Sequence, residues 1–237
     1  CALPIFIIMS TGNVKIFKIG HKNGDPLHMY GNDVYEPSLA DGSDLNKLCS
    51  EFSVIESIIE NKTLMDELPK YVGICHYRCA YFTEEMTGSF QRDFDNSAKM
   101  ITVLLSEDID GIYSESFAPN ITVGLSRTRW TGSNSAFYAH VALSKVAPEL
   151  IQNFDKYLNS TEKSYRTICV LKKELFTLLF TDIVFMIPHL IQLRSDAGEL
   201  YPRSVGYDLE LLVSFYLIYY SKTRSMKKLN YSIRNYE

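Results

Sequence analysis

The segment Tyr71–Arg78 constrains the fold more strongly than any other part of this chain. A short apolar stretch begins after Pro69 and ends abruptly in His76, Tyr77 and Arg78, whose side chains can transfer protons, bind a metal or hold a phosphate. In an open α/β sheet, ligands bind in the crevice outside the carboxyl ends of the strands. The segment therefore predicts a buried strand with a functional site at its end.

The alternative is a wholly buried strand whose polar residues bond to one another in the interior. Cysteine is often buried and tyrosine is common in strands, so we interpret Cys75 as structural. For His76, Tyr77 and Arg78 taken together, function is the better interpretation.

The composition fits a globular protein without a nucleic-acid partner. At 237 residues the chain can form one large α/β domain or two small ones. The formal charge of −4 provides no basic footprint for nucleic acid, and 46% hydrophobic with 22% charged residues is ordinary for a soluble domain. The five cysteines have no zinc-ligand spacing, which favours reduced thiols in a cytoplasmic protein.

Neither end of the chain carries a convincing membrane signal. The apolar opening Cys1–Ile8 has no basic leader or cleavage site and is too short to span a bilayer. Because polar sequence follows Met9, we interpret residues 1–8 as an upstream extension or a cloning remnant. Residues 221–237 form a basic tail that we expect to be solvated. Without a repeat or a linker, residues 1–237 are expected to form one domain.

Strand-like and helix-like segments alternate along the chain. Strands are expected at Val14–Gly20, Tyr71–Tyr77, Gly111–Tyr113, Ile121–Val123 and Thr167–Leu171. Helices are expected at Asp44–Asn61, Phe94–Leu105, Ala136–Leu158 with an interruption at Pro148, Lys172–Leu193 with a break or kink at Pro188, and Gly206–Tyr220. This alternation predicts a largely parallel, doubly wound sheet flanked by helices.

The glycine-rich fingerprints of common α/β enzymes are missing from the sequence. There is no G-x-G-x-x-G after the first strand, no G-x-x-x-x-G-K-[ST] and no G-x-S-x-G. Dinucleotide dehydrogenases, P-loop NTPases and nucleophile-elbow hydrolases are therefore disfavoured. Nucleotide-sugar-dependent glycosyltransferases of the GT-A type are a leading class among the Rossmann-like folds that remain.

The strand-end motif carries a family resemblance. Cys75–Phe82 resembles the Cys-His-Tyr-Arg-Arg-Tyr-Phe signature of bacterial capsular and exopolysaccharide glycosyltransferases, a family long catalogued as a domain of unknown function. Further blocks agree in order over roughly Val14 to Leu217. They are His21-Lys22, Ser50–Ser53, Val170–Phe176 and Gly206–Leu212. The chain departs from the family pattern at Cys79 and Ala80, Thr167 and Leu211.

The resemblance implies a GT-A-like, Rossmann-type α/β fold with a mixed, mainly parallel sheet. It also implies a hexosyltransferase that moves sugar from a nucleotide-sugar donor, a UDP-sugar being favoured, to a growing polysaccharide or glycan. The donor-binding candidates are His21, Lys22, Glu51, His76, Tyr77 and Arg78. The catalytic candidates are Glu210 and Asp208, and the acceptor-binding candidates are Trp130, Tyr138 and His140.

Each candidate also has a structural interpretation. Lys22 can bind a diphosphate as a point charge or lie on a solvated loop, while Arg78 matches phosphate bidentately. Glu51 interrupts an apolar helical stretch, so a buried carboxylate that orients a neighbour competes with a surface glutamate. Glu210 is the preferred base, because Asp208 sits where helix N-termini favour acidic residues anyway.

The sequence also offers candidates for a metal site. His76, Asp108 and Asp110 are weak candidates for holding Mn²⁺ or Mg²⁺ against the diphosphate. Asp108 and Asp110 precede a strand, where turn chemistry is the commoner reason for aspartate. No organic cofactor is expected.

Partners and location follow from the same resemblance. The expected partners are a nucleotide-sugar donor and a glycan or lipid-linked sugar acceptor, with at most peripheral contact to the inner face of a membrane. Two other classes stay open: a catalytically silent carbohydrate- or protein-binding module of the same fold, and a metal-dependent hydrolase that uses Asp108, Asp110 and His76.

Overall fold

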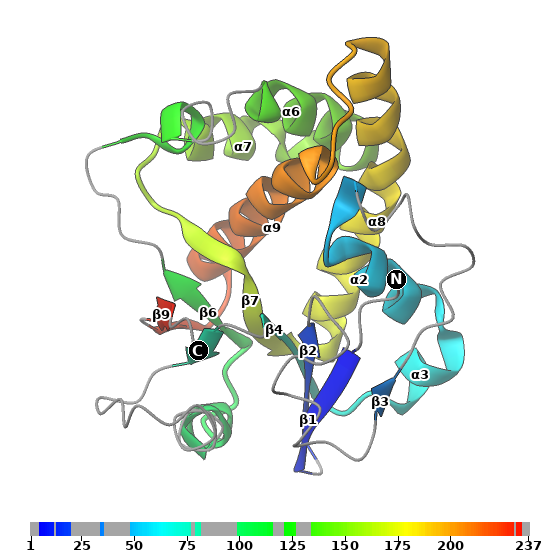
Figure 1. Cartoon of the computed structure of the whole chain (residues 1–237). Coiled ribbons are helices and arrows are strands. Elements are labelled where there is room, and N and C mark those ends of the chain that lie inside the picture. Colours follow the sequence, from blue (N-terminus) through cyan, green and yellow to red (C-terminus); the bar gives the residue numbers. More distant parts are fainter. Residues whose placement is uncertain are drawn as a thin grey trace.

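A computed structural model describes residues 5–11, 13–19, 34–35, 48–76, 79–81, 99–115, 121–126, 134–229 and 231–233. Its centre is a seven-stranded sheet in the order β3-β1-β2-β4-β7-β6-β8. The strands are β1 (Ile5–Thr11), β2 (Val14–Ile19), β3 (Val34–Tyr35), β4 (Tyr71–His76), β6 (Gly111–Glu115), β7 (Ser164–Lys172) and β8 (Met226–Leu229), and β5 (Cys79–Tyr81) pairs with β9 (Tyr231–Ile233). The helices are α2 (Phe52–Glu60), α3 (Lys62–Glu67), α6 (Ser135–Val146), the short 3₁₀ helix η2 (Pro148–Leu150), α7 (Ile151–Leu158), α8 (Lys173–Asp196) and α9 (Ser204–Thr223) (Figure 1).

The sheet is mixed, and most of its strands run in one direction. β2 is parallel to β4, and β6 is parallel to β8. β7 is antiparallel to both of its neighbours, β4 and β6. β1 is antiparallel to β2 and β3. Only β1 and β7 therefore oppose the other five strands, which confirms the expected mixed, mainly parallel α/β sheet.

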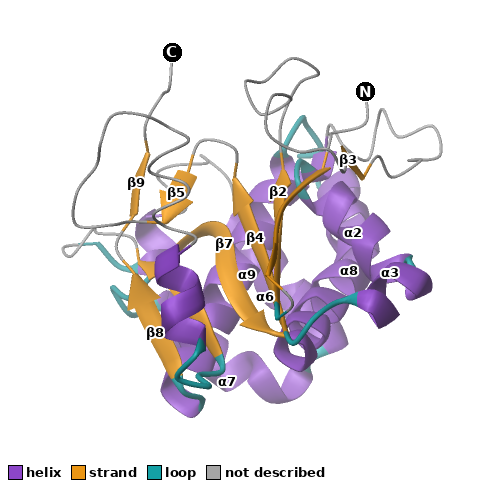
Figure 2. Ribbon diagram, turned by 90° about the horizontal axis from the view of Figure 1, so that it is seen from below, coloured by secondary structure: helices purple, strands orange, loops and turns teal. Residues whose placement is uncertain are grey.

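Side chains alternate between the two faces of the sheet and divide the core in two. Val72 and Ile74 of β4 face the larger apolar cluster, which includes residues of α2, α8 and α9. Tyr71 and Val170 face a smaller cluster together with the helical residues 99–105. Figure 2 shows α2, α8 and α9 together on one side of the sheet. Within that layer α9 contacts β7, α6 and α8, so it lies at the centre of the larger core.

Both ends of the chain differ from the sequence-based expectation. Residues 5–8, which we interpreted as an extension, belong to β1 and pair with β2 and β3. Residues 226–229, expected in a solvated tail, form β8 beside β6. Met226 and Leu229 pack against the apolar clusters, while Lys227 forms an ion pair with Glu107. The apolar residues of this strand are partly buried and Lys228 is exposed, so its composition resembles that of a basic tail.

Two further expectations are wrong. Residues 123–126 are helical instead of continuing a strand from Ile121. α8 continues through Pro188 and ends at Asp196, so of the expected break or kink the break does not occur. Pro188 is exposed, and its missing N–H removes a bond to the carbonyl of Val184 at a partly exposed position, where water can replace it. Among the described helices, α8 alone is long and apolar enough to cross a membrane; 39% of its most apolar window is buried in the fold.

Candidate functional site

β2 and β4 end at the same edge of the sheet. They are parallel, and the register pairs Ile19 with His76, the last residue of each strand. The candidates His21-Lys22 and Tyr77-Arg78 follow these strand ends directly in the sequence. All four lie outside the described residues, and of His76 only the backbone is described. The register therefore places the last residues of β2 and β4 side by side, at the edge where ligands bind in open α/β sheets.

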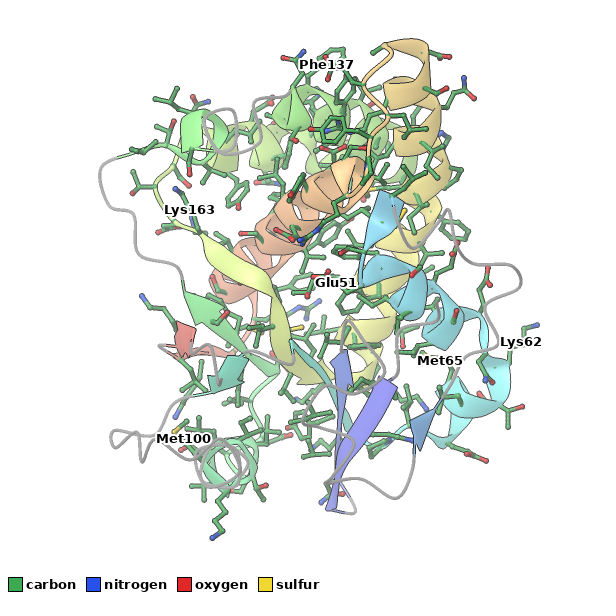
Figure 3. The ribbon with its side chains drawn as sticks, in the orientation of Figure 1. Glu51, Lys62, Met65, Met100, Phe137 and Lys163 are labelled. Atoms are coloured by element: carbon green, nitrogen blue, oxygen red, sulfur yellow. The ribbon has the colours of Figure 1, made fainter. Side chains whose placement is uncertain are left out.

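Glu51 lies in the interior near this edge. It precedes α2, and 4% of the residue is exposed. Thr167 of β7 donates a hydrogen bond from Oγ1 to Glu51 Oε1 over 3.4 Å. Because antiparallel β7 pairs Cys169 with Ile74, Thr167 lies toward the end of β4. Figure 3 shows Glu51 at the start of α2, facing the interior of the molecule. The expected buried carboxylate is therefore present.

A strained turn positions Glu51. The residue before it, Ser50, has a positive φ of 58°, which a residue with a Cβ rarely adopts. The turn packs against the first turn of α9, where a Cβ added to Gly206 would lie 3.1 Å from the carbonyl oxygen of Cys49. Gly206 thus permits a close approach that a side chain would obstruct. Burial, together with the carboxylates of Glu56 and Asp208, raises the pKa of the Cys49 thiol to about 12, so this thiol is structural.

Glu210 lies on the side of α9 that faces this turn. It follows Gly206 by four residues, which places both on one helix face a turn apart. One further turn along, Ser214 Oγ donates to the carbonyl of Ser164 at the start of β7 over 2.9 Å. Glu210 is partly buried between these two contacts. The preferred base and Glu51 thus approach the same end of β7 from two helices.

Asp208, the other catalytic candidate, is a structural residue. Its carboxylate is completely buried and accepts two hydrogen bonds from Arg194, from Nε over 2.6 Å and from Nη2 over 2.7 Å. Arg194 also donates to Ser135 Oγ, so the pair joins α6, α8 and α9. A carboxylate held bidentately in the interior cannot reach an acceptor hydroxyl, and Asp208 is withdrawn from the site.

The expected acceptor residues do not come together. Tyr138 is 4% exposed. The Cζ atom of Arg194 lies over its ring, 4.6 Å from the ring centroid. Tyr138 is therefore a core residue, and its burial raises the pKa of its hydroxyl above the ordinary value. His140 Nε2 lies 3.3 Å from Asp155 Oδ1 at the contact between α6 and α7. Trp130 lies outside the described residues.

The expected metal candidates lie at opposite ends of β4. Asp108 pairs with Lys70 over 2.6 Å, beside the first residue of β4, whereas His76 is the last. With about 3.3 Å per strand residue, the two ends are roughly 16 Å apart. Asp110 pairs with Lys172 over 3.0 Å. The lysines lower the pKa of both aspartates, which act as counter-ions. Within the described ranges no group of three metal-ligating side chains occurs.

Two important residues were missed as site or scaffold components. Thr167 was noted only as a departure from the family pattern, yet it contacts Glu51. Arg194 was not singled out, although one arginine near the end of a long apolar helix is a recognisable signal for a buried ion pair.

The fold and the shared strand edge define the class of the protein. The chain is similar to the solved apo structure of the WbbM bifunctional glycosyltransferase, with a TM-score of 0.65 over 80% of this chain and 18% sequence identity. At this identity the similarity establishes the fold alone. The chain spans 37% of the length of that protein. It is thus an α/β protein with a GT-A-like fold of the kind found in a glycosyltransferase.

The sequence then gives the particular family. Residues 21–222 match the family described as a domain of unknown function, DUF4422. Because the match covers most of the chain, the protein belongs to that family. No curated protein matches the sequence.

Proposed function

We propose that the protein is a nucleotide-sugar-dependent hexosyltransferase that extends a polysaccharide or glycan, with a UDP-sugar as the favoured donor. The observation that carries the proposal is the parallel register of Ile19 with His76. It places the ends of β2 and β4 at one edge, and the sequence that follows each strand contains a cationic residue suited to a diphosphate. The shared fold and the family membership support the same class.

The donor site would use charge to stabilise the leaving group. Lys22 and Arg78 follow the two strand ends and are each a few residues of chain away from them. Their charges would balance the negative charge that develops on the departing nucleoside diphosphate. His21, His76 and Tyr77 complete the proposed donor set. A Mn²⁺ or Mg²⁺ ion against the diphosphate belongs to the proposal as well, and it would add to the charge that Lys22 and Arg78 supply.

Glu210 would deprotonate the acceptor hydroxyl. It lies on the face of α9 that points to the turn bearing Glu51, one helical turn beyond Gly206. A carboxylate in this position suits a general base, which contributes about 10²–10⁴-fold to a rate. The acceptor is proposed to be a glycan or lipid-linked sugar, and the setting to be cytoplasmic capsule or exopolysaccharide synthesis.

The first experiment is calorimetric titration of the protein with UDP, GDP, dTDP and CMP, each with Mn²⁺ and then with EDTA. We expect saturable binding of one nucleotide and a loss of about tenfold or more in Arg78→Ala, because a charge-assisted phosphate contact is removed. Arg224→Ala is the matched control. Arg224 is exposed, and its charge lowers the pKa of Asp110, which lies at the opposite edge of the sheet. Failure of all four nucleotides to bind would instead favour the silent binding module.

Nucleotide release in the presence of sugar acceptors tests the chemical step. Glu210→Gln should lower turnover about 100-fold or more while leaving nucleotide affinity within about twofold. Unchanged turnover in this variant would remove Glu210 from catalysis without affecting the donor-binding result.

A further inference from the structure

We propose that the Glu51 carboxylate accepts hydrogen bonds from hydroxyl groups of the bound nucleotide-sugar. This inference rests on the proposed function and assigns Glu51 a direct contact with the donor. Its starting point is an imbalance in hydrogen bonding at a buried charge. An ionised carboxylate offers about four acceptor sites, and the described residues fill one of them, through Thr167 Oγ1 at 3.4 Å. None of the ion pairs among those residues includes Glu51, which is 4% exposed.

A buried carboxylate with so few donors is unfavourable unless something else supplies them. The fold nevertheless keeps Glu51 in this position by means that themselves carry strain. Ser50 is held at a φ of 58°, and a side chain at position 206 would crowd the carbonyl of Cys49. Strained backbone of this kind persists where the surrounding structure enforces it and is common at ligand sites.

The chemistry of the Glu51 carboxylate selects hydroxyl groups among possible ligands. A phosphate would be repelled by the carboxylate, and a divalent ion would require further ligands that the described residues do not supply around Glu51. A hydroxyl donates its proton to a carboxylate without placing a second charge in the interior. When Thr167 donates to Glu51, its own lone pairs stay available for a second hydroxyl. A vicinal pair of hydroxyls fits Glu51 and Thr167 together, and both the ribose and the hexose of a nucleotide-sugar carry such groups.

Calorimetry with modified nucleotides distinguishes a contact with the ribose hydroxyls from a contact with the hexose hydroxyls. Wild type, Glu51→Gln and the control Glu56→Gln, which alters a partly buried carboxylate further along α2, are titrated with UDP, 2′-deoxy-UDP and UDP-galactose. If the wild type binds GDP, the corresponding guanosine compounds are used. For a ribose contact, we expect Glu51→Gln to weaken UDP about tenfold and 2′-deoxy-UDP by less than twofold. For a hexose contact, the loss appears with UDP-galactose and not with UDP.

Equal affinities of wild type and Glu51→Gln for all three compounds would overturn the inference. Absence of nucleotide binding by the wild type would instead overturn the proposed function, so the two failures are distinguishable. Thermal unfolding without nucleotide supplies a second readout. A carboxylate kept for a ligand should be replaceable by Gln with an unchanged or higher melting temperature, whereas a carboxylate needed by the fold would lower it. Thr167→Val should reproduce the affinity loss in part, because the methyl group keeps the volume and removes the hydroxyl.

Discussion

Two carboxylates next to the first turn of α9 are buried almost equally and are treated in opposite ways. Asp208 is completely buried and bound by Arg194 through two short hydrogen bonds. Glu51 is 4% exposed and receives one hydrogen bond of 3.4 Å. The charge of Asp208 is balanced inside the fold by a cation, whereas Glu51 keeps acceptor capacity that folding does not use. The pairing of buried charges therefore separates a scaffold residue from a candidate binding residue more clearly than burial does.

The largest loss of stability should follow from removing the cation that pairs with Asp208. Arg194→Leu leaves the Asp208 carboxylate buried without a cation, and we expect a loss of about 3–5 kcal/mol in the free energy of unfolding. Urea denaturation followed by circular dichroism measures it. The double variant Arg194→Leu/Asp208→Leu should recover much of the loss, since no charge then stays in the interior. A loss below about 1 kcal/mol in the single variant would show that water reaches this pair.

A smaller effect should follow from separating the turn of Glu51 from α9. Gly206→Ala places a Cβ 3.1 Å from the carbonyl oxygen of Cys49, and backbone cannot move aside as a side chain can. We expect a loss of about 1–3 kcal/mol, typical of overpacking, together with weaker nucleotide binding because Glu51 is displaced. Ser50→Gly is the contrasting variant. Glycine adopts a φ of 58° readily, so stability should stay within about 1 kcal/mol of wild type. Equal losses of stability in the two variants would argue against a role for the contact between Gly206 and Cys49 in holding the turn of Glu51.

The sequence predicted the layers of this fold better than its ends. Apolar periodicity identified β4, β7 and α9, because each of these elements buries a continuous apolar face. The same reasoning missed β8, whose lysines stay on the surface while Met226 and Leu229 reach the core. A strand at the edge of a sheet carries half of the apolar pattern, so composition alone resembles a solvated tail.

The candidate site shows the same limit for a different reason. Glu51 was recognised as a buried carboxylate because it interrupts an apolar helical stretch. Asp208 was predicted to be catalytic and Tyr138 to bind the acceptor. In the core, however, Arg194 forms an ion pair with Asp208 and lies over the ring of Tyr138. The partner of a buried charge is set by tertiary packing between α6, α8 and α9, which local sequence does not encode. Similarly, the Asp108-Ile109-Asp110 segment looked available for a metal until the lysines facing it were known.

A third carboxylate, Asp182 on α8, is intermediate in how fully it is paired. Its replacement should give the smallest change in stability. It accepts one good hydrogen bond, from the Tyr216 hydroxyl over 2.7 Å, but no cation. Burial raises the pKa of this carboxyl group above its ordinary value. Its stabilising contribution is therefore fully present below the unfolded-state pKa of about 3.9 and is lost as pH rises through the higher folded-state pKa.

Asp182→Asn keeps an acceptor for Tyr216 and removes the charge that burial disfavours. At pH 7 we expect the variant to be more stable than wild type by at most about 1 kcal/mol, since partial exposure screens the charge. The difference should shrink as the pH falls below the folded-state pKa and vanish below the unfolded-state pKa, where Asp182 is neutral in both states of the wild type. Urea denaturation of both proteins between pH 3 and pH 7 measures this. A constant difference over that range would mean that packing, and not ionisation, distinguishes the two side chains. A variant less stable than wild type at pH 7 would place Asp182 with Asp208, among carboxylates whose charge the fold needs.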